Sequence, residues 1–417
     1  MPSGIYLHIP FCRIKCPYCD FNTFAGIIDQ MPRYLAALET ELERRLIEAA
    51  PSPYDVASVY FGGGTPSLIP PESVADLLQV VRRHGAPRGG LEVTLEANPG
   101  TVDRARLQAF RDAGVTRLTI GAQTFRPHLL AGLSRLHDVD QTRAALADAR
   151  AVGFDELNLD LMFAQSRQSQ DEWEADLDDA FAEEPTHLSL YNLTVEEGTP
   201  LGRLRAAGRL PLPDEEACRA MYVAALGAAR DAGMLRYEVS NFARPGSECV
   251  HNRIYWRGDP WLGIGAGAHG FAPERGDWGR RWWNLRVPRQ YCEAVEAGRP
   301  PEDGDELLDR HQAISEALLL GLRTSDGLDR AGFERRFGFD PVPAFGRVGA
   351  DAVERGLLQV DDRSVVPTED GVIILDFVIE RLARQLDRSP HFDTLNSCKQ
   401  DDSVQRVGGA SPPARSR

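Results

Sequence analysis

The pattern of apolar and polar positions alternates between helical and strand-like periods along the first 240 residues. Residues 32–49 carry four leucines at helical spacing, and an apolar run of strand-like composition follows at 56–61. Further helical stretches end at Gly114, Gly153 and Gly233, and an apolar run comes after each of these glycines. This repeated order of helix, glycine and strand predicts a parallel sheet with helices packed on it.

Seven strands are expected in this part of the chain, and their order decides the fold class. They lie near residues 4–9, 56–61, 91–95, 116–120, 156–161, 186–191 and 235–239. Because helices alternate with these strands, we predict an α/β fold whose sheet closes partly or fully into a (β/α) barrel. Ligands and chemistry then belong at the carboxyl ends of the strands.

The pattern changes after residue 304, where helical periods dominate. Apolar residues recur at helical spacing in 313–322 and 342–356, and two short strand-like runs follow at 357–360 and 364–367. A final helix is expected at about 370–386. Helices followed by a small hairpin predict a compact winged-helix-like α+β domain, a fold that does not by itself define a function.

The chain is thus expected to have four parts. The last is a polar tail that contains Cys398 and has too little apolar content to fold on its own. The four parts are a barrel core at 1–240, a connecting region at 241–304, a C-terminal winged-helix-like domain at 305–388 and a tail, expected to be disordered, at 389–417.

Three of the seven cysteines lie close together near the start of the sequence. Cys12, Cys16 and Cys19 follow a strand-like run that ends at Pro10, and their C-x3-C-x2-C spacing places them on one loop. Three cysteines leave a structural zinc site one ligand short. A [4Fe-4S] cluster held by three thiolates keeps one iron open for a small chelating molecule. The spacing alone leaves open a chance group of buried or zinc-bound cysteines.

Polar or glycine-rich segments follow the expected strands directly. The glycine triplet and threonine at 62–65 would let the backbone approach a ligand closely, and the segment lacks the lysine and spacing of a phosphate-binding P-loop. Glu96, Gln123 and Asp160 stand at the ends of three later strands and could hydrogen-bond a ribose or an amino acid. Each residue alone could equally be structural, but their shared position favours a function.

The composition limits the compartment and the partners. The 417 residues include 42% hydrophobic and 26% charged residues, as in a soluble globular chain, and no apolar run approaches membrane-spanning length. The cysteine motif begins too early to leave room for a cleaved signal peptide, so the cytoplasm is the expected compartment. A net charge of −15 argues against a nucleic-acid partner, which needs a basic surface.

Taken together, these segments resemble the radical S-adenosylmethionine (SAM) superfamily over roughly residues 4 to 380. In that family three cysteines hold a [4Fe-4S] cluster, whose open iron binds the amino and carboxylate groups of SAM. One departure is the segment 163–166, where the family usually has a Gly-Leu-Pro turn, so we expect a looser loop there. The resemblance implies Cys12, Cys16 and Cys19 as cluster ligands and Tyr6, Tyr18, Gly63, Gly64, Thr65, Glu96, Gln123, Arg135 and Asp160 as SAM contacts.

Within the superfamily the chain resembles two related groups, the oxygen-independent coproporphyrinogen III dehydrogenases and the HemW heme chaperones. The dehydrogenases carry an additional cysteine two residues after the third cluster cysteine, where this chain has Phe21. They also have a longer N-terminal extension, whereas Cys12 is almost at the start here. Both differences favour the chaperones.

The segment from Cys249 to Trp256 supplies a further point of resemblance. It places an imidazole beside two aromatic rings, which suits an iron porphyrin, and its H-N-x-x-Y-W portion is similar to the heme-associated motif of the chaperones. The resemblance implies His251 as the candidate axial ligand and Cys249 as a less favoured one, with heme contacts from His251, Asn252, Tyr255 and Trp256. A polar structural histidine is the alternative interpretation of His251.

Two functions are therefore open. In the favoured one, the chain binds heme and transfers it to acceptor proteins, membrane respiratory enzymes among them, while the cluster and SAM occupy the barrel. In the other, it is a radical SAM enzyme that decarboxylates coproporphyrinogen III oxidatively to protoporphyrinogen IX. No residue is assigned a catalytic role, and a homodimer and a peripheral membrane location are left open.

Overall fold

The computed structural model describes residues 2–49, 55–273 and 278–388. The tail expected at 389–417, with Cys398, lies outside the described residues. The chain divides into two compact units, Met1–Leu328 and Asp329–Arg417, which are considered separately. The four-part organisation expected from the sequence stays a prediction.

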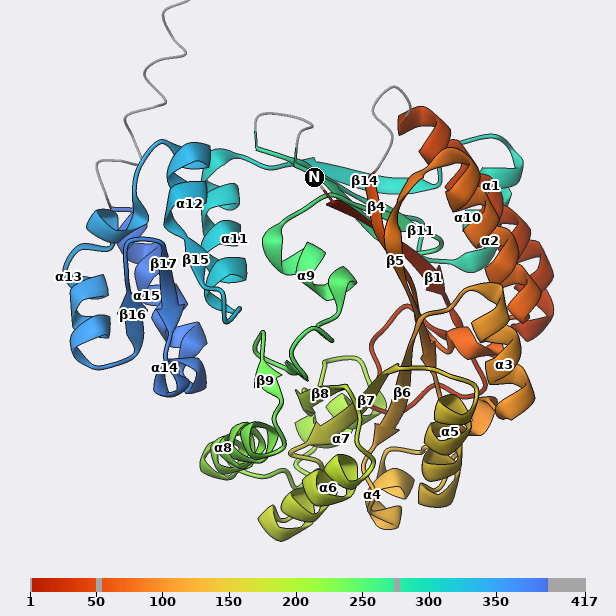
Figure 1. Cartoon of the computed structure of the whole chain (residues 1–417), viewed down its shortest axis with the longest axis horizontal. Coiled ribbons are helices and arrows are strands. Elements are labelled where there is room, and N and C mark those ends of the chain that lie inside the picture. Colours follow the sequence, from red (N-terminus) through yellow and green to blue (C-terminus); the bar gives the residue numbers. More distant parts are fainter. Residues whose placement is uncertain (1, 50–54, 274–277, 389–417) are drawn as a thin grey trace, which may run out of the picture. The chain divides into compact units, whose positions relative to one another are not determined.

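The main sheet of the first unit has twelve strands among the described residues (Figure 1). Its first and last strands in sheet order, β14 (Glu302–Leu307) and β9 (Leu235–Arg236), do not pair with each other, so the expected barrel is partial. The parallel strands are β11 (Trp261–Ile264), β1 (Pro2–Ile9), β4 (Asp55–Gly63), β5 (Ala86–Ala97), β6 (Arg117–Gln123), β7 (Glu156–Phe163) and β8 (His187–Asn192), in that order.

Six of the expected strands are present, but the parallel strand predicted at 235–239 was wrong. Only β9 forms there, and it pairs antiparallel with β10 (Asn241–Ala243), which lies antiparallel to β8. Glu238 and Asn241 are buried and hydrogen-bonded to each other, so this stretch turns back instead of extending. The place of a seventh parallel strand is taken by β11, which pairs with β1.

Beyond β11 the sheet continues through three antiparallel strands, in a region expected only to connect two domains. They are β12 (His269–Ala272), β13 (Arg280–Asn284) and β14. Antiparallel strands need only short connections, whereas the parallel strands are joined through helices. Beyond β11 the sheet therefore changes from parallel to antiparallel pairing.

Helices cover the outer face of the parallel strands, and α9 (Val250–Arg257) lies on the inner face (Figure 1). Local signals start and stop several of them: capping boxes open α5 (Val139–Ala151) and α6 (Gln170–Ala182), and Gly114 ends α3 (Arg104–Ala113) in a left-handed conformation. The other helices of this unit are α1 (Met31–Ala49), α2 (Pro71–His84), α3 (Arg104–Ala113), α4 (Pro127–Gly132), α5 (Val139–Ala151), α6 (Gln170–Ala182), α7 (Pro200–Ala206), α8 (Glu215–Asp231), α10 (Pro288–Glu296) and α11 (Arg310–Leu322), with 3-10 turns η1 (Ile28–Gln30), η2 (Pro66–Leu68) and η3 (Pro99–Thr101).

The second unit is a small α+β domain. Its three-stranded sheet has the order β15-β17-β16, and β16 and β17 form the expected hairpin. The single final helix predicted at 370–386 is two helices, α14 (Glu369–Ile373) and α15 (Leu375–Leu386), which are separated by the non-helical Ile374. Gly371 of α14 packs so closely on the Leu357 carbonyl that a Cβ would lie 1.9 Å from its oxygen. The apolar face of α15 is buried. The elements are β15 (Leu328–Asp329), α12 (Arg330–Phe337), α13 (Pro341–Glu354), β16 (Leu358–Val360), β17 (Ser364–Pro367), α14 (Glu369–Ile373) and α15 (Leu375–Leu386).

One buried carboxylate joins the parallel strands to the antiparallel extension. Glu41 of α1 is fully buried and accepts hydrogen bonds from the Gly265 backbone N–H (2.9 Å), the Asn284 amide (2.8 Å) and the Tyr291 hydroxyl (2.7 Å). Burial raises the pKa of Glu41, and the positive charge of Arg45 opposes that shift. Glu41 thus connects α1 with the turn after β11, with β13 and with α10.

We predict that Glu41→Ala lowers the free energy of unfolding by about 3 kcal/mol, because three buried donors lose their acceptor. Glu39→Ala, at an exposed position of the same helix, should change it by less than about 0.5 kcal/mol. Urea denaturation of both variants measures the difference. Equal stabilities of the two variants would contradict the role given to Glu41.

Candidate functional site

The three clustered cysteines lie on a loop whose two ends are joined by a short two-stranded sheet. After β1, the short strand β2 (Phe11–Cys12) pairs in parallel with β3 (Phe24–Ala25), and the Phe24 N–H donates to the carbonyl of Pro10 (2.8 Å). Inside the loop the Lys15 ammonium donates to the carbonyls of Phe21 (3.2 Å) and Thr23 (3.3 Å). Residues 12–23 are therefore held together although they carry little regular structure.

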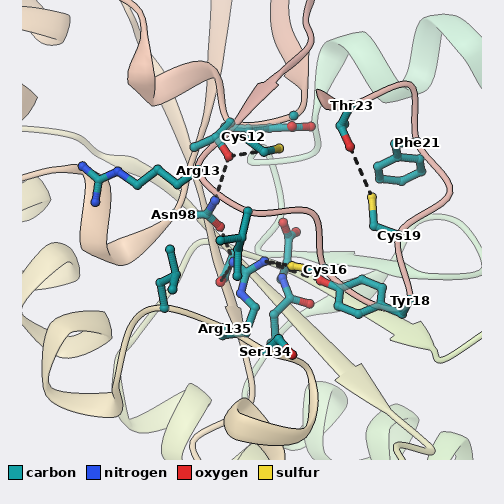
Figure 2. A pocket seen from close by; sticks show the side chains of 18 of the residues that line it. Cys12, Arg13, Cys16, Tyr18, Cys19, Phe21, Thr23, Asn98, Ser134 and Arg135 are labelled. Atoms are coloured by element: carbon teal, nitrogen blue, oxygen red, sulfur yellow. Dashed lines mark hydrogen bonds between the residues drawn. The ribbon is translucent and has the colours of Figure 1, made fainter. Parts of the chain in front are cut away.

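Cys12, Cys16 and Cys19 line one cavity of about 560 Å³ (Figure 2). Each has a donor or hydroxyl within reach of its sulfur: Thr65 Oγ1 at 3.6 Å from Cys12, Arg135 Nη1 at 3.9 Å from Cys16 and Thr23 Oγ1 at 3.9 Å from Cys19. Burial raises the pKa of the Cys12 and Cys19 thiols, and these hydroxyls oppose the shift. Donors directed at sulfur are what a cluster thiolate requires from its surroundings.

The cysteines in the described ranges are free thiols. A tetrahedral structural zinc site needs four protein ligands, whereas a [4Fe-4S] cluster can be held by three thiolates with one iron left open. Three free thiols that line one cavity of about 560 Å³ fit the cluster.

The glycine triplet at the end of β4 lies directly against the start of the cysteine loop. Its backbone bonds to the loop directly: the Gly64 N–H donates to the Ile9 carbonyl and the Thr65 N–H to the Phe11 carbonyl, both at 2.8 Å. A Cβ at Gly64 would lie 2.7 Å from the Phe11 carbonyl oxygen and 3.0 Å from the Cys12 sulfur. Only glycine permits this approach, so the segment fixes the position of Cys12.

The polar residues expected at later strand ends are brought to the same cavity. Tyr18, Glu96, Gln123, Arg135 and Asp160 all line it, as do Gly63, Gly64 and Thr65. The Arg135 guanidinium donates to the Gly121 carbonyl (2.9 Å) and to the Tyr18 hydroxyl (3.5 Å). Residues from four strands and the cysteine loop thus surround one space, as the order of the parallel sheet predicts.

Sequence reasoning missed Asn98 as a site residue. Its amide nitrogen donates to Thr65 Oγ1 (3.0 Å), and its amide oxygen accepts from Arg135, so it links two predicted SAM contacts (Figure 2). Its position two residues after Glu96, in the same segment at a strand end, was the available signal. Thr23, which lies near the Cys19 sulfur, had no such signal in the sequence.

Two carboxyl groups in the cavity have altered acidity. Burial, and then the charge of Asp160, raises the pKa of Glu96 to about 7, and burial raises the pKa of Asp160 to about 6. Glu96 is held by the Tyr60 hydroxyl (2.9 Å) and the Gly63 N–H (3.1 Å). Near neutral pH each carboxyl can hold or release a proton, and so can donate or accept a hydrogen bond to a bound hydroxyl.

Tyr6 is the one expected SAM contact that does not line the cavity of the cysteine loop. Alternate residues of β1 face opposite sides, so Tyr6 points to the inner face, where it stacks on Tyr60 with 6.1 Å between ring centres. There it lines a second cavity of about 240 Å³ together with His251, Asn252 and Tyr255. Glu96 and Asp160 also line this second cavity, so Tyr6 lies between the expected SAM contacts and the heme candidates.

His251 is buried in this second cavity, with 2% of its surface exposed. Its Nδ1 is 2.8 Å from Ser58 Oγ and its Nε2 is 2.9 Å from the Tyr255 hydroxyl. Burial lowers the pKa of His251 to about 3, so the ring is neutral. Both ring nitrogens are engaged, and binding to a heme iron would require one of these hydrogen bonds to break. Trp256 is half-buried and does not line this cavity.

Glu92 anchors the helix that carries His251. Its carboxylate accepts from the backbone N–H groups of Val250 (3.1 Å) and His251 (3.0 Å) and from the Cys249 thiol (3.4 Å). A carboxylate at this position satisfies donors that the first turn of α9 leaves unpaired. Burial, and then the charge of Glu92, raises the pKa of Cys249 to about 12, so this thiol stays protonated.

The looser loop expected at 163–166 was wrong. Gln165 is buried, its side chain donates to the Met162 carbonyl (2.8 Å), and its N–H donates to Gln168 (3.1 Å). The Ser166 hydroxyl donates to the Pro211 carbonyl (2.8 Å). Side-chain hydrogen bonds hold this turn in place of the glycine and proline that the family usually has there.

In the described part of the chain, no helix is both long enough and apolar enough to cross a bilayer.

Comparisons with known proteins agree with this geometry. Residues 6–180 match the family model of the radical SAM superfamily, and residues 308–374 match that of the HemN C-terminal domain. The heme chaperone HemW of Mycobacterium tuberculosis is 39% identical over 385 residues, which cover 91% of this chain and 95% of that protein. The heme chaperone HemW of Bacillus subtilis is 33% identical over 374 residues, covering 89% and 97%.

A solved structure shares the fold. It is that of the coproporphyrinogen III oxidase HemN from Escherichia coli, with a TM-score of 0.76 at 22% sequence identity over 93% of this chain and 90% of that one. The chain therefore belongs to the radical SAM superfamily and, within it, to the HemW family. Membership of the superfamily implies a [4Fe-4S] cluster and SAM as cofactors, which the free thiols and strand-end residues of the first cavity fit.

The raised pKa of Glu96 predicts a dependence of stability on pH. Folding favours the protonated acid, so the contribution is complete below about pH 4, the pKa of an unfolded glutamate, and is lost as the pH rises through about 7. In Glu96→Gln the side chain stays neutral. Between about pH 5 and pH 8 the free energy of unfolding should therefore fall by about 2–3 kcal/mol less than in the unchanged chain.

Urea denaturation of the cofactor-free chain at the two pH values measures this difference, with Glu39→Gln at an exposed position as the control. Parallel pH profiles for Glu96→Gln and the unchanged chain would show that Glu96 is ionised in the fold at both pH values.

Proposed function

We propose that this chain is a heme chaperone, which binds heme and transfers it to acceptor proteins while a [4Fe-4S] cluster and SAM occupy the partial barrel. The observation that carries the proposal is 39% identity to a protein named heme chaperone HemW over 95% of that protein's length. Phe21, which stands where the dehydrogenases have a further cysteine, supports the same function.

In this proposal Cys12, Cys16 and Cys19 are the cluster ligands. When bound, the cluster supplies an electron and SAM supplies radical chemistry. The chain's own residues would orient SAM: the backbone of the glycine triplet would face its amino group, and polar side chains at the strand ends would bind its carboxylate and ribose. These residues are Tyr18, Gly63, Gly64, Thr65, Glu96, Gln123, Arg135 and Asp160, which line the first cavity. Tyr6 lines the second cavity together with Glu96 and Asp160.

The proposal extends to partners and location. Acceptors would include membrane respiratory enzymes, which a cytoplasmic chaperone would meet at the membrane surface as a peripheral protein. A homodimer is a further part of this proposal, because a chaperone that releases its cargo needs a second state and association can provide one.

The alternative is oxidative decarboxylation of coproporphyrinogen III. Its support is the shared fold with the HemN structure, which at 22% identity concerns the fold alone. It would need a substrate site that tolerates Phe21, 65% exposed, at the position of the dehydrogenases' extra cysteine.

The assignment of cluster ligands predicts the behaviour of Cys16→Ser. The variant should lose at least about tenfold in cluster affinity after anaerobic reconstitution, since even partners outside the ligand set change metal affinity by that much. Cys218→Ser is the matched control, because Cys218 is a partly buried free thiol on α8 outside the first cavity. Iron and sulfide analysis with visible absorbance measures both, and full iron content in Cys16→Ser would contradict the assignment.

A second experiment separates the two functions. The reconstituted chain receives SAM and reductant, and hemin and coproporphyrinogen III are offered separately. We expect stoichiometric hemin binding, no loss of carboxylates by mass spectrometry, and faster recovery of oxidase activity in heme-depleted membranes than free hemin gives at the same concentration. Formation of protoporphyrinogen IX over several turnovers would contradict the chaperone and establish the decarboxylase.

A further inference from the structure

A third cavity, of about 400 Å³, adjoins the two already described. It shares Phe21 and Gly63 with the first cavity, which the cysteine loop lines. It shares Tyr6 and Tyr255 with the second cavity, the polar cavity that contains His251. Glu96 lines all three. Its volume is within the range of sites that enclose a cofactor or drug-sized ligand. The cavity therefore lies directly beside the loop that we assign to the cluster.

The wall of this cavity continues into an aromatic surface on the antiparallel extension. In the register of the strands, Trp261 pairs with Phe271 and His269 pairs with Trp283, so these side chains share one face. Ring centres are 4.8 Å apart between Tyr255 and Trp261 and 5.1 Å between Trp261 and Phe271. Trp261 and Trp283 are only half-buried. A broad, partly exposed set of rings suits a flat aromatic macrocycle.

His269 is exposed at this cavity and differs from the other histidines near it. Its carbonyl accepts from the Trp261 indole N–H (2.9 Å), which fixes the strand, and its ring lies 6.0 Å from that of Trp283. Its imidazole makes no hydrogen bond to any other residue that the structure describes. Both ring nitrogens of His8, by contrast, are engaged, as are those of His251. Of the three, His269 is the one whose nitrogen can reach an iron without breaking a bond.

Positive charge lies near the same imidazole. Burial, and then the charges of Arg281 and Arg286, lowers the pKa of His269, which places both guanidinium groups within electrostatic range. Arg281 is paired with Glu306 and Glu316. Arg286 is exposed, and its side chain has no acidic partner among the described residues. A cation of this kind can pair with a carboxylate of a bound ligand.

We propose that this third cavity is the heme site, with His269 as the iron ligand, Phe21 and Trp261 against the macrocycle, and Arg286 paired with a propionate. The inference rests on the proposed chaperone function and deepens it. His251 then acts as a positioning residue: it holds Tyr255, which forms part of the cavity wall, through the hydrogen bond at its Nε2. Phe21, a residue of the cysteine loop, would stand between the heme and the cluster, since it lines both cavities.

Hemin titration of the full chain with its reconstituted cluster tests the ligand. Electron paramagnetic resonance reports the ferric heme, because the oxidised cluster has no unpaired-electron signal. We expect His269→Ala to lose roughly tenfold or more in hemin affinity and His269→Met to bind hemin with a changed signal. His251→Ala loses the hydrogen bond to Tyr255, so it should weaken hemin binding less than His269→Ala does and keep the native heme signal. His128→Ala, an exposed histidine on α4, is the control.

The outcomes distinguish the inference from the function on which it rests. If both His269 variants bind hemin with the native signal and affinity while His251→Ala loses them, the inference is overturned and the chaperone function stands. If the unchanged chain binds no hemin, the proposed function itself fails. Far-UV circular dichroism and cluster absorbance show that each variant is folded.

The propionate contact has its own test. Arg286→Glu should weaken binding of hemin by roughly fivefold or more and leave binding of hemin dimethyl ester, which has no carboxylates, unchanged. An equal loss for hemin and its ester would contradict the contact and show that Arg286→Glu disturbs the cavity in another way.

Discussion

The arrangement depends on the close approach of β1 and β4 at the glycine triplet. A Cβ at Gly63 would lie 2.5 Å from the ring of His8, and one at Gly62 would lie 2.8 Å from the rings of Tyr6 and Tyr60. Gly63 also has φ of 115°, a backbone conformation that other residues rarely adopt. Any side chain here would separate the strands and move the cysteine loop, whose backbone bonds to Gly64. The triplet is therefore first a packing requirement and only then a ligand contact.

This constraint explains why three cavities meet at one point. The Gly63 N–H donates a hydrogen bond to Glu96. Glu96 lines all three: the first cavity with the cysteines, the second with His251 and the third with His269. Its pKa of about 7 makes its charge responsive to what is bound nearby. A ligand in any of the three spaces would change the electrostatic environment of the same carboxyl group. Under the proposed assignment of these cavities, Glu96 would link the sites of cluster, SAM and heme.

Much of this could be predicted from local sequence, and the failures have a common cause. Helical spacing and stop glycines gave six of the parallel strands, and strand order brought Glu96, Gln123 and Asp160 together. The pairing of β11 with β1 joins distant segments, and no local period encodes it. For the same reason the aromatic surface around Trp261 was not expected. The assignment of His251 as a heme ligand stays a prediction, and sequence could not show that Ser58 and Tyr255 lie within hydrogen-bond distance of its two ring nitrogens.

The most direct test of the account is the position of iron in a crystal of the chain with cluster, SAM and heme. An anomalous difference map at the iron absorption edge locates iron without reference to any assumed ligand. The account predicts one strong multi-iron peak within bonding distance of Cys12, Cys16 and Cys19, and a separate single-iron peak at the imidazole of His269. A single-iron peak at His251, inside the polar cavity, would contradict it.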